Sequence, residues 1–193
     1  MVGFYFQIAI GLWALWLVSW HLGALWRSKP TVKADRRSYR LLFVMVALGF
    51  FLVFNAIPRL GQPLLWPVSA PLGWSMEGLI MTGILFAWWA RVHLGKLWSG
   101  GIERMAEHRV VDSGPYAIVR HPIYTGLIAA AFATAAIRAT PWAFLGAALF
   151  ALGFALKAKV EERFLEAELG GYEAYRARVP MIVPWPARLR RAA

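Results

Sequence analysis

The residues with the clearest chemical potential lie in a short segment at positions 114–126, which reads GPYAIVRHPIYTG. It combines two tyrosines, a guanidinium and an imidazole immediately before an apolar stretch. Proline suits the first turn of a helix, so Pro122 predicts a helix start there and places Val119 to His121 at the N-terminus of that helix. Free backbone amides and the positive end of the helix dipole would favour a bound carboxylate at this point.

A second pair of charged residues follows about forty positions later. Lys157 and Glu161 are four residues apart and therefore share one face of a helix. Glu161 can hold an ammonium or a sulfonium-bearing ligand, while Lys157 faces an anion. A ligand with an amino acid headgroup requires both charges. The spacing alone is weakly specific, because such a pair is commonly a solvated ion pair.

Several common site types have no support in the sequence. It contains no Gly-x-Gly-x-x-Gly, no Walker loop, no His-Glu-x-x-His and no Gly-x-Ser-x-Gly motif. It also contains no cysteine, which excludes disulfides, thiolate nucleophiles and cysteine-ligated metals. The four histidines are widely scattered, and we predict no metal site.

The elements that must position these groups are strongly apolar. Of the 193 residues, 60% are hydrophobic, 16% are charged and eleven are tryptophan, which indicates a membrane protein. We predict an all-α fold with about five transmembrane helices, the last two joined as a hairpin. The apolar segments are Phe4 to Trp26, Leu41 to Ile57, Leu72 to Ala90, Ile123 to Ile137 and Pro141 to Leu156.

The distribution of positive charge predicts the orientation in the membrane. The formal net charge is +11, yet 19 of the 21 Lys and Arg residues fall in alternate connections, with Arg59 and Arg138 as exceptions. This asymmetry predicts an N-terminus outside and a C-terminus in the cytoplasm, in the cytoplasmic (inner) membrane. The first cation, Arg27, follows the first apolar run, so we expect that run to remain as a span rather than act as a signal peptide. Nucleic acid is not an expected partner.

Outside the spans, two polar regions are candidates for binding. The connection from Arg91 to Val119 is long and Gly-rich, which favours a cytosolic binding loop. The stretch from Lys157 to Arg178 reads as a helix that continues past the bilayer and breaks at Gly170-Gly171. Glu77 lies about one turn into the third apolar segment, where we expect it to be exposed and stabilised by the helix dipole.

The motifs taken together resemble those of the isoprenylcysteine carboxyl methyltransferase family of integral membrane enzymes. The resemblance covers about Leu94 to Pro184 and implies S-adenosyl-L-methionine bound on the cytosolic side, without a Rossmann fold. It divides a single membrane domain, 1–193, into N-terminal spans, 1–93, and a cofactor-binding half, 94–193. The motifs that carry it are SGPY at 113–116, RHPxYxG at 120–126, Glu161-Glu162, Gly170, Tyr172, Tyr175 and RVP at 178–180.

The resemblance also implies roles for individual residues. Lys157 and Arg178 are the expected catalytic residues, and Lys157 would also bind the substrate. Eukaryotic members carry Arg at the position of Lys157, and a lysine offers a point charge instead of a planar fork. The residues expected to bind the cofactor are His108, Arg109, Val110, Val111, Tyr116, His121, Pro122, Ile123, Tyr124 and Glu161.

The predicted activity is transfer of a methyl group to a lipophilic acceptor, either a small molecule or a lipid, with a carboxylate favoured. N- or S-methylation of a phospholipid amine or a small thiol is the alternative, which needs a base that His108 or Tyr124 could supply. A sterol-reductase-like enzyme and a non-enzymatic scaffold in contact with membrane lipids are less favoured alternatives. Small residues along Ala129 to Ala136 and Gly146 to Gly153 predict close helix packing, within a protomer or between protomers, and leave the oligomeric state open.

Overall fold

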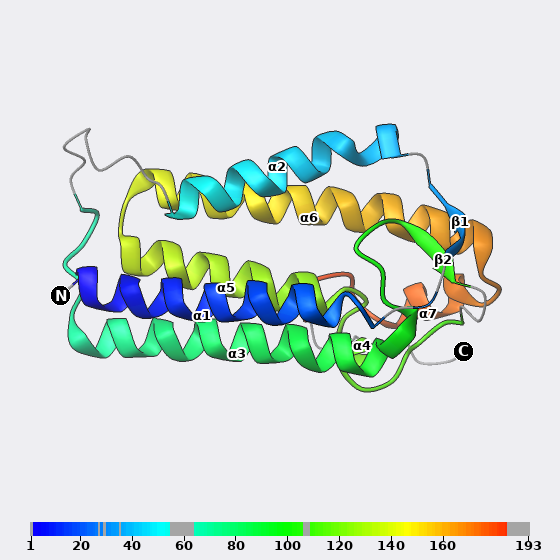
Figure 1. Ribbon diagram of the computed structural model, residues 1–193, viewed down its shortest axis with the longest axis horizontal. Coiled ribbons are helices and arrows are strands. Elements are labelled where there is room, and N and C mark those ends of the chain that lie inside the picture. The colour runs from blue at the N-terminus through cyan, green and yellow to red at the C-terminus, as the bar shows by residue number, and fades with distance from the viewer. Residues whose placement is uncertain are drawn as a thin grey trace, which may run out of the picture.

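The computed structural model describes residues 2–26, 28, 30–34, 36–54, 64–105 and 109–184. Helices dominate it, and five long ones run roughly side by side (Figure 1). The elements in chain order are α1 (Val2–Gly23), β1 (Pro30–Lys33), α2 (Arg36–Phe54), α3 (Ala70–Leu94), η2 (Gly95–Leu97), β2 (Glu103–Met105), α4 (Pro115–Ile118), α5 (Pro122–Arg138), α6 (Pro141–Glu168) and α7 (Tyr172–Arg178).

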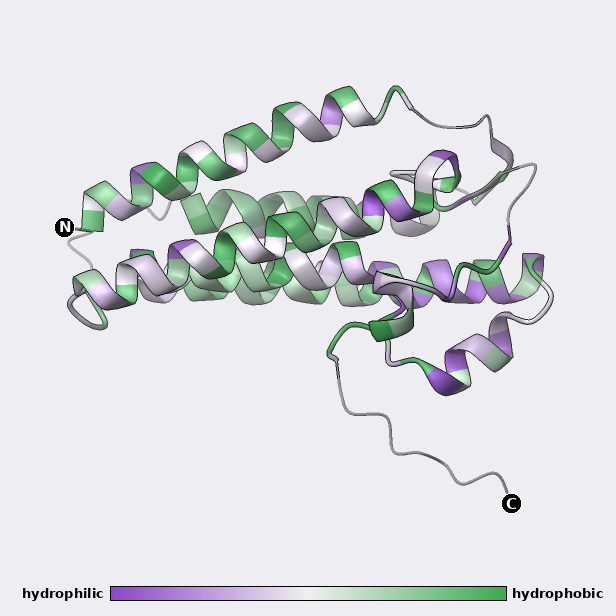
Figure 2. Cartoon of the chain, turned by 90° about the horizontal axis from the view of Figure 1, so that it is seen from below, coloured by the Kyte–Doolittle hydropathy of each residue, from purple (hydrophilic) through white to green (hydrophobic). Residues whose placement is uncertain are grey.

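The described residues of each of the five predicted apolar segments lie mainly on one long helix, which confirms the helical membrane character of the chain. Among the described residues, three helices are long and apolar enough to cross a bilayer, namely α1, α3 together with η2, and α6. The apolar parts of α2 and α5 are shorter. Hydrophobic residues cover the helix bodies, and hydrophilic residues concentrate at the end where α7 lies (Figure 2).

The predicted helix boundaries near the polar motifs are also confirmed. Pro122 and Pro141 each stand at the first position of a helix, and the Thr140 side chain caps α6 by accepting a hydrogen bond from the amide of Ala143. Helix α6 runs past the predicted span to Glu168. Gly171, with φ of 82°, then begins the separate helix α7, because this left-handed backbone conformation favours glycine.

Close packing between helix pairs organises the bundle. Helix α2 packs along α6 and α3 along α5, while α1 lies against α3 and α5. At the α3–α5 contact, a β-carbon added to Gly83 would lie 2.4 Å from the Gly126 carbonyl oxygen. Gly49 and Gly146 make the corresponding contact between α2 and α6. The close packing predicted for Gly146 therefore occurs within one chain.

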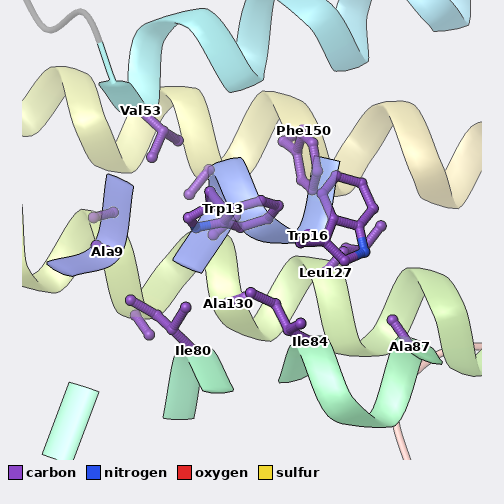
Figure 3. Packing of buried hydrophobic residues seen from close by; sticks show 14 of the residues in the cluster. Ala9, Trp13, Trp16, Val53, Ile80, Ile84, Ala87, Leu127, Ala130 and Phe150 are labelled. Carbon is purple, nitrogen blue, oxygen red and sulfur yellow. The ribbon is translucent and has the colours of Figure 1, made fainter. Parts of the chain in front are cut away.

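The centre of the bundle is built around Trp13 of α1, which is 1% exposed (Figure 3). Its indole packs edge-on against Phe50 of α2 and Phe150 of α6. Its N–H donates to the Thr134 hydroxyl of α5 at 3.0 Å, which satisfies the one polar atom of the ring. Trp13 thus joins four helices at one point.

Two features differ from the sequence-based expectations. Strands β1 and β2 form an antiparallel pair, with Lys33 opposite Glu103, in a chain predicted to be all-α. The strands are too short to show an alternating pattern, and backbone pairing between two loops produces them. Glu77 is buried, not exposed, because α1 packs on this face of α3 and Tyr5 covers Gly73 one turn earlier.

Candidate functional site

A cavity of about 290 Å³ opens where α5, α6 and α7 meet α1 and the loop that follows α3. Ten of the predicted site residues contribute to its lining, although they come from a loop, the short helix α4 and the two helices α5 and α6. They are Arg109, Val110, Val111, Tyr116, His121, Pro122, Ile123, Tyr124, Lys157 and Glu161.

Two predicted site residues do not join this group. His108 lies outside the residues that the structure describes. Arg178 ends α7 at the surface, where its side chain is 65% exposed and donates to the Asp112 carboxylate at 3.1 Å. Among the described residues that line the cavity, Arg178 is absent. The structure therefore gives it no contact with the site for which it was predicted.

Lys157 and Glu161 are connected through the hydroxyl of Tyr124. The Lys157 ammonium donates to the Tyr124 oxygen at 2.8 Å, and that hydroxyl donates to Glu161 Oε2, also at 2.8 Å. The ammonium further donates to the Gly100 carbonyl at 3.2 Å and lies 5.2 Å from the centre of the Phe43 ring. A buried cation and a partly exposed carboxylate are thus held at a fixed separation on one wall of the cavity.

The neighbouring carboxylate, Glu162, has a different role. It is buried and receives two hydrogen bonds from Arg120, while Nε2 of His121 lies 3.1 Å from its Oε1. The His121 ring stacks on Tyr124, with ring centroids 5.2 Å apart and an angle of 7° between the planes. Glu162 therefore orients His121, which in turn supports the Tyr124 ring.

Sequence reasoning did not assign Arg120 or Glu162 to the site. Both were visible in the motifs, but Glu161 and Glu162 are adjacent acids, and spacing from Lys157 favoured the first of them. The Arg120-His121 pair is the signal that could have distinguished Glu162 from Glu161, because two inward-facing cationic side chains require a buried anion. Only the fold shows that they do.

The backbone amides of the segment 119–121 were expected to bind an anionic ligand, and this expectation is wrong for all three. The amide of Val119 donates to the Pro115 carbonyl at 3.3 Å. The amide of Arg120 donates to the Pro180 carbonyl at 2.8 Å, and the amide of His121 donates to Met181 at 3.0 Å. The chain after α7 therefore runs back along the start of α5. Carbonyl groups of the protein occupy the positions predicted for a ligand.

Buried tyrosines form the wall between the loop and α7. Tyr116 and Tyr175 are less than 9% exposed, and the Tyr175 hydroxyl donates to the Tyr116 carbonyl at 2.7 Å. Burial raises the pKa of Tyr116, Tyr172 and Tyr175 above the ordinary tyrosine range. Their phenols remain neutral across the physiological range and act as hydrogen-bonding and packing groups.

The far end of the cavity, toward the bundle interior, is apolar. Its lining there comes from α1, α5 and α6, and the Trp16 and Trp20 rings lie 5.3 Å apart. Trp98, from the loop after η2, packs edge-on against Trp20. The site thus combines a charged end with an apolar end, which suits a polar cofactor beside a nonpolar reactant.

Part of the chain is similar in sequence to known proteins. Residues 76–167 match the sequence model of the Isoprenylcysteine carboxyl methyltransferase (ICMT) family. The chain is 31% identical over 173 residues to methanethiol S-methyltransferase 2 of Bradyrhizobium diazoefficiens, an alignment that covers 82% of this chain and 63% of that protein. It is 44% identical over 75 residues to methanethiol S-methyltransferase of Mycobacterium tuberculosis, covering 38% of this chain and 30% of that protein.

The chain therefore spans less than two thirds of the length of each of these two relatives. The segment matched by the family model begins in α3 and includes α4, α5 and nearly all of α6. It contains the connected residues Tyr124, Lys157 and Glu161. Through this region, the chain is similar to the isoprenylcysteine carboxyl methyltransferase family.

Proposed function

We propose that this protein is an integral membrane methyltransferase that uses S-adenosyl-L-methionine to methylate a small thiol. The single observation that carries the proposal is the chain of hydrogen bonds from Lys157 through Tyr124 to Glu161 on the wall of a mostly apolar cavity. The names of both relatives support a thiol acceptor. The name of the matching family supports the carboxylate favoured by the sequence, but neither of the two relatives is named for a carboxylate.

The residues present fit the cofactor. Glu161 is partly exposed to the cavity and can pair with an ammonium group, while Arg109 supplies a positive charge for a carboxylate. Val110, Val111 and Tyr116 offer apolar and aromatic surface for a nucleoside. When bound, S-adenosyl-L-methionine supplies a methyl group on a sulfonium, which a nucleophile can displace.

The positive charge of Lys157 favours an anionic acceptor in this site. A thiolate, not a thiol, is the effective nucleophile, so the acceptor must lose its proton. A buried ammonium stabilises a nearby sulfur anion more strongly than it would in water, because the surrounding dielectric is low. Tyr124 and Gly100 hold that ammonium in place, so the acceptor is positioned before reaction.

The same cation argues against a phospholipid amine. An amine acceptor carries positive charge at neutral pH before it loses its proton, and a buried ammonium next to it would raise its energy. A lipophilic carboxylate remains compatible with Lys157 and serves as the second candidate. The two differ in acidity, since a carboxylate is fully ionised at neutral pH and a thiol is not.

We further propose that the cavity opens toward the cytoplasm in the inner membrane, with the N-terminus outside. The positive charges of the connections at this end of the bundle support that orientation. In this arrangement the cofactor approaches from water. The apolar end of the cavity then lies at membrane depth, where a nonpolar thiol partitions.

The proposal is tested with the purified full chain in detergent and S-adenosyl-L-methionine labelled in its methyl group. Three acceptors are compared: methanethiol, a prenylated cysteine carboxylate and phosphatidylethanolamine. We expect label in the volatile thioether, at a rate that falls steeply on the acid side. Label confined to the carboxylate or to the lipid amine would overturn the thiol assignment.

A further inference from the structure

Trp98 forms part of the cavity wall beside the proposed acceptor position. It lies in the loop after η2, is 9% exposed and lines the cavity. Its ring packs edge-on against Trp20, with centroids 5.4 Å apart and an angle of 88°. Two residues further along the chain, the Gly100 carbonyl accepts a hydrogen bond from the Lys157 ammonium. The loop that carries Trp98 is therefore bound directly to the Lys157 ammonium.

The guanidinium of Arg91, on α3, packs against the face of the Trp98 ring. Arg91 is 1% exposed, and its guanidinium carbon lies 4.4 Å from the centre of the Trp98 ring. The guanidinium donates to the carbonyls of Gly23 at 2.6 Å, Trp26 at 2.8 Å and Gly95 at 2.8 Å. These carbonyls stand at or just beyond the C-terminal ends of α1 and α3, where the helix dipoles favour a cation.

This geometry depends on arginine in particular. The planar guanidinium can stack on an indole while its in-plane N–H groups bind carbonyls at its edge, which a lysine ammonium cannot do. The loop is also fixed on its other side, where Ser99 donates to Glu103 at 2.6 Å and the Gly101 amide donates to Ser99 at 3.0 Å. The indole of Trp98 is therefore held in one position, since its own loop is tied on both sides.

We propose that Trp98 sets the maximum length of the acceptor thiol, and that Arg91 is a positioning residue that acts through Trp98. This inference rests on the proposed function. We expect a fixed indole packed on Trp20 to leave room for a short alkyl group in the cavity and to exclude a long one. In a hydrophobic pocket each methylene changes discrimination by about 10- to 200-fold, so removal of an indole should change the acceptor range.

The test compares methanethiol, butanethiol and hexanethiol as acceptors for the wild-type chain and its variants. In Trp98→Ala, we expect the ratio of kcat/KM for hexanethiol to that for methanethiol to rise at least about tenfold. Trp98→Phe should give a smaller rise. Arg91→Lys should shift the ratio in the same direction, with the dissociation constant for S-adenosyl-L-methionine unchanged by calorimetry. The control is Trp89→Ala, because Trp89 is 48% exposed on the same helix as Arg91.

An unchanged ratio in folded Trp98→Ala would overturn the length-setting role. An equal loss for all three thiols in Arg91→Lys, or a loss of cofactor affinity, would overturn the positioning role. Arg91→Gln is the second variant, since its amide can still bind a carbonyl. If neither Arg91 variant folds, Arg91 is a structural residue and its positioning role is refuted.

A binding measurement separates this inference from the proposed function. If the wild-type chain methylates no thiol, the function assignment fails regardless of Trp98. The stabilisation of the wild type and of Trp98→Ala by methyl hexyl thioether can still be compared by thermal unfolding. A greater stabilisation of Trp98→Ala supports the steric role of Trp98, and equal stabilisation contradicts it.

Discussion

Arg120 and Glu162 form a two-point ion pair, with Nε 2.7 Å from Oε1 and Nη2 3.0 Å from Oε2. Both side chains are less than 9% exposed. The remaining nitrogen of Arg120, Nη1, donates to the carbonyls of Arg176, at 2.9 Å, and Val179. One guanidinium therefore joins the start of α5, the C-terminal part of α6 and the end of α7, and these elements build the polar end of the cavity.

Removal of one member of this pair should destabilise the protein strongly. We expect Glu162→Gln to lower the free energy of unfolding by about 3 kcal/mol or more, because it leaves the buried Arg120 without its counter-charge. Thermal unfolding of the purified protein in detergent measures the change. The control is Glu166→Gln, whose partner Arg176 is 51% exposed and whose loss should cost about 0–1 kcal/mol. Equal effects of the two substitutions would contradict the structural role of the buried pair.

The contact between α3 and α5 requires glycine on both sides. A β-carbon at Gly126 would lie 2.2 Å from the Gly83 carbonyl oxygen, so Gly126→Ala must push the helices apart. We expect a loss of about 1–3 kcal/mol in unfolding free energy, the usual range for overpacking. Gly78→Ala is the matched control on α3, since a β-carbon there meets no atom within 4 Å. A destabilisation of Gly78→Ala as large as that of Gly126→Ala would count against this packing.

Lys157 should control the acceptor and its ionisation. In Lys157→Met we expect the KM for the thiol to rise and the cofactor affinity to persist, because the ammonium that stabilises the thiolate is lost. The rise of kcat with pH should also shift to higher pH, since the thiol in the enzyme–substrate complex would then ionise less readily. Lys159→Met, two residues away and exposed, is the control. An unchanged pH profile in Lys157→Met would refute this role.

The segment after α7 should contribute to cofactor binding through its contact with α5. The Thr125 hydroxyl donates to the Ile182 carbonyl at 2.6 Å and reinforces the backbone bonds from Arg120 and His121. Thr125→Val removes this bond, and we expect cofactor affinity to fall by about 0.5–1.5 kcal/mol. Calorimetric titration provides the measurement. Thr82→Val, which removes an exposed bond to Gly78, should leave the affinity unchanged; a similar fall there would show that the effect is not local.

Much of the fold could be predicted because hydrophobic runs and helix-starting prolines are local signals. The five apolar segments, the helix starts at Pro122 and Pro141 and the break at Gly171 all follow from neighbouring residues. The β1–β2 pair could not be predicted, because it joins loops about 70 residues apart and shows no periodic pattern. Likewise, α1 buries Glu77 against expectation, since burial depends on which helix lies opposite.

In the candidate site, too, local features could be predicted from the sequence and features set by long-range contacts could not. Spacing linked Lys157 to Glu161, and the family resemblance of the motifs added Tyr124 to the same predicted site; all three line the cavity. The direction of each side chain was not available from sequence. His121 turns to Glu162, the amides of Arg120 and His121 bind the chain after α7, and Arg178 turns to Asp112 at the surface. Long-range contacts decide each of these outcomes.

The most direct test of the central claim is the affinity of the purified protein for S-adenosyl-L-methionine when Glu161 is changed. Glu161→Ala removes the carboxylate proposed to pair with the cofactor ammonium, whereas Glu166→Ala changes a glutamate further along α6 whose carboxylate binds Arg176 instead. By calorimetric titration in detergent, we expect binding to be lost in the first variant and retained in the second. Wild-type affinity in Glu161→Ala would contradict the assignment of this cavity as the cofactor site.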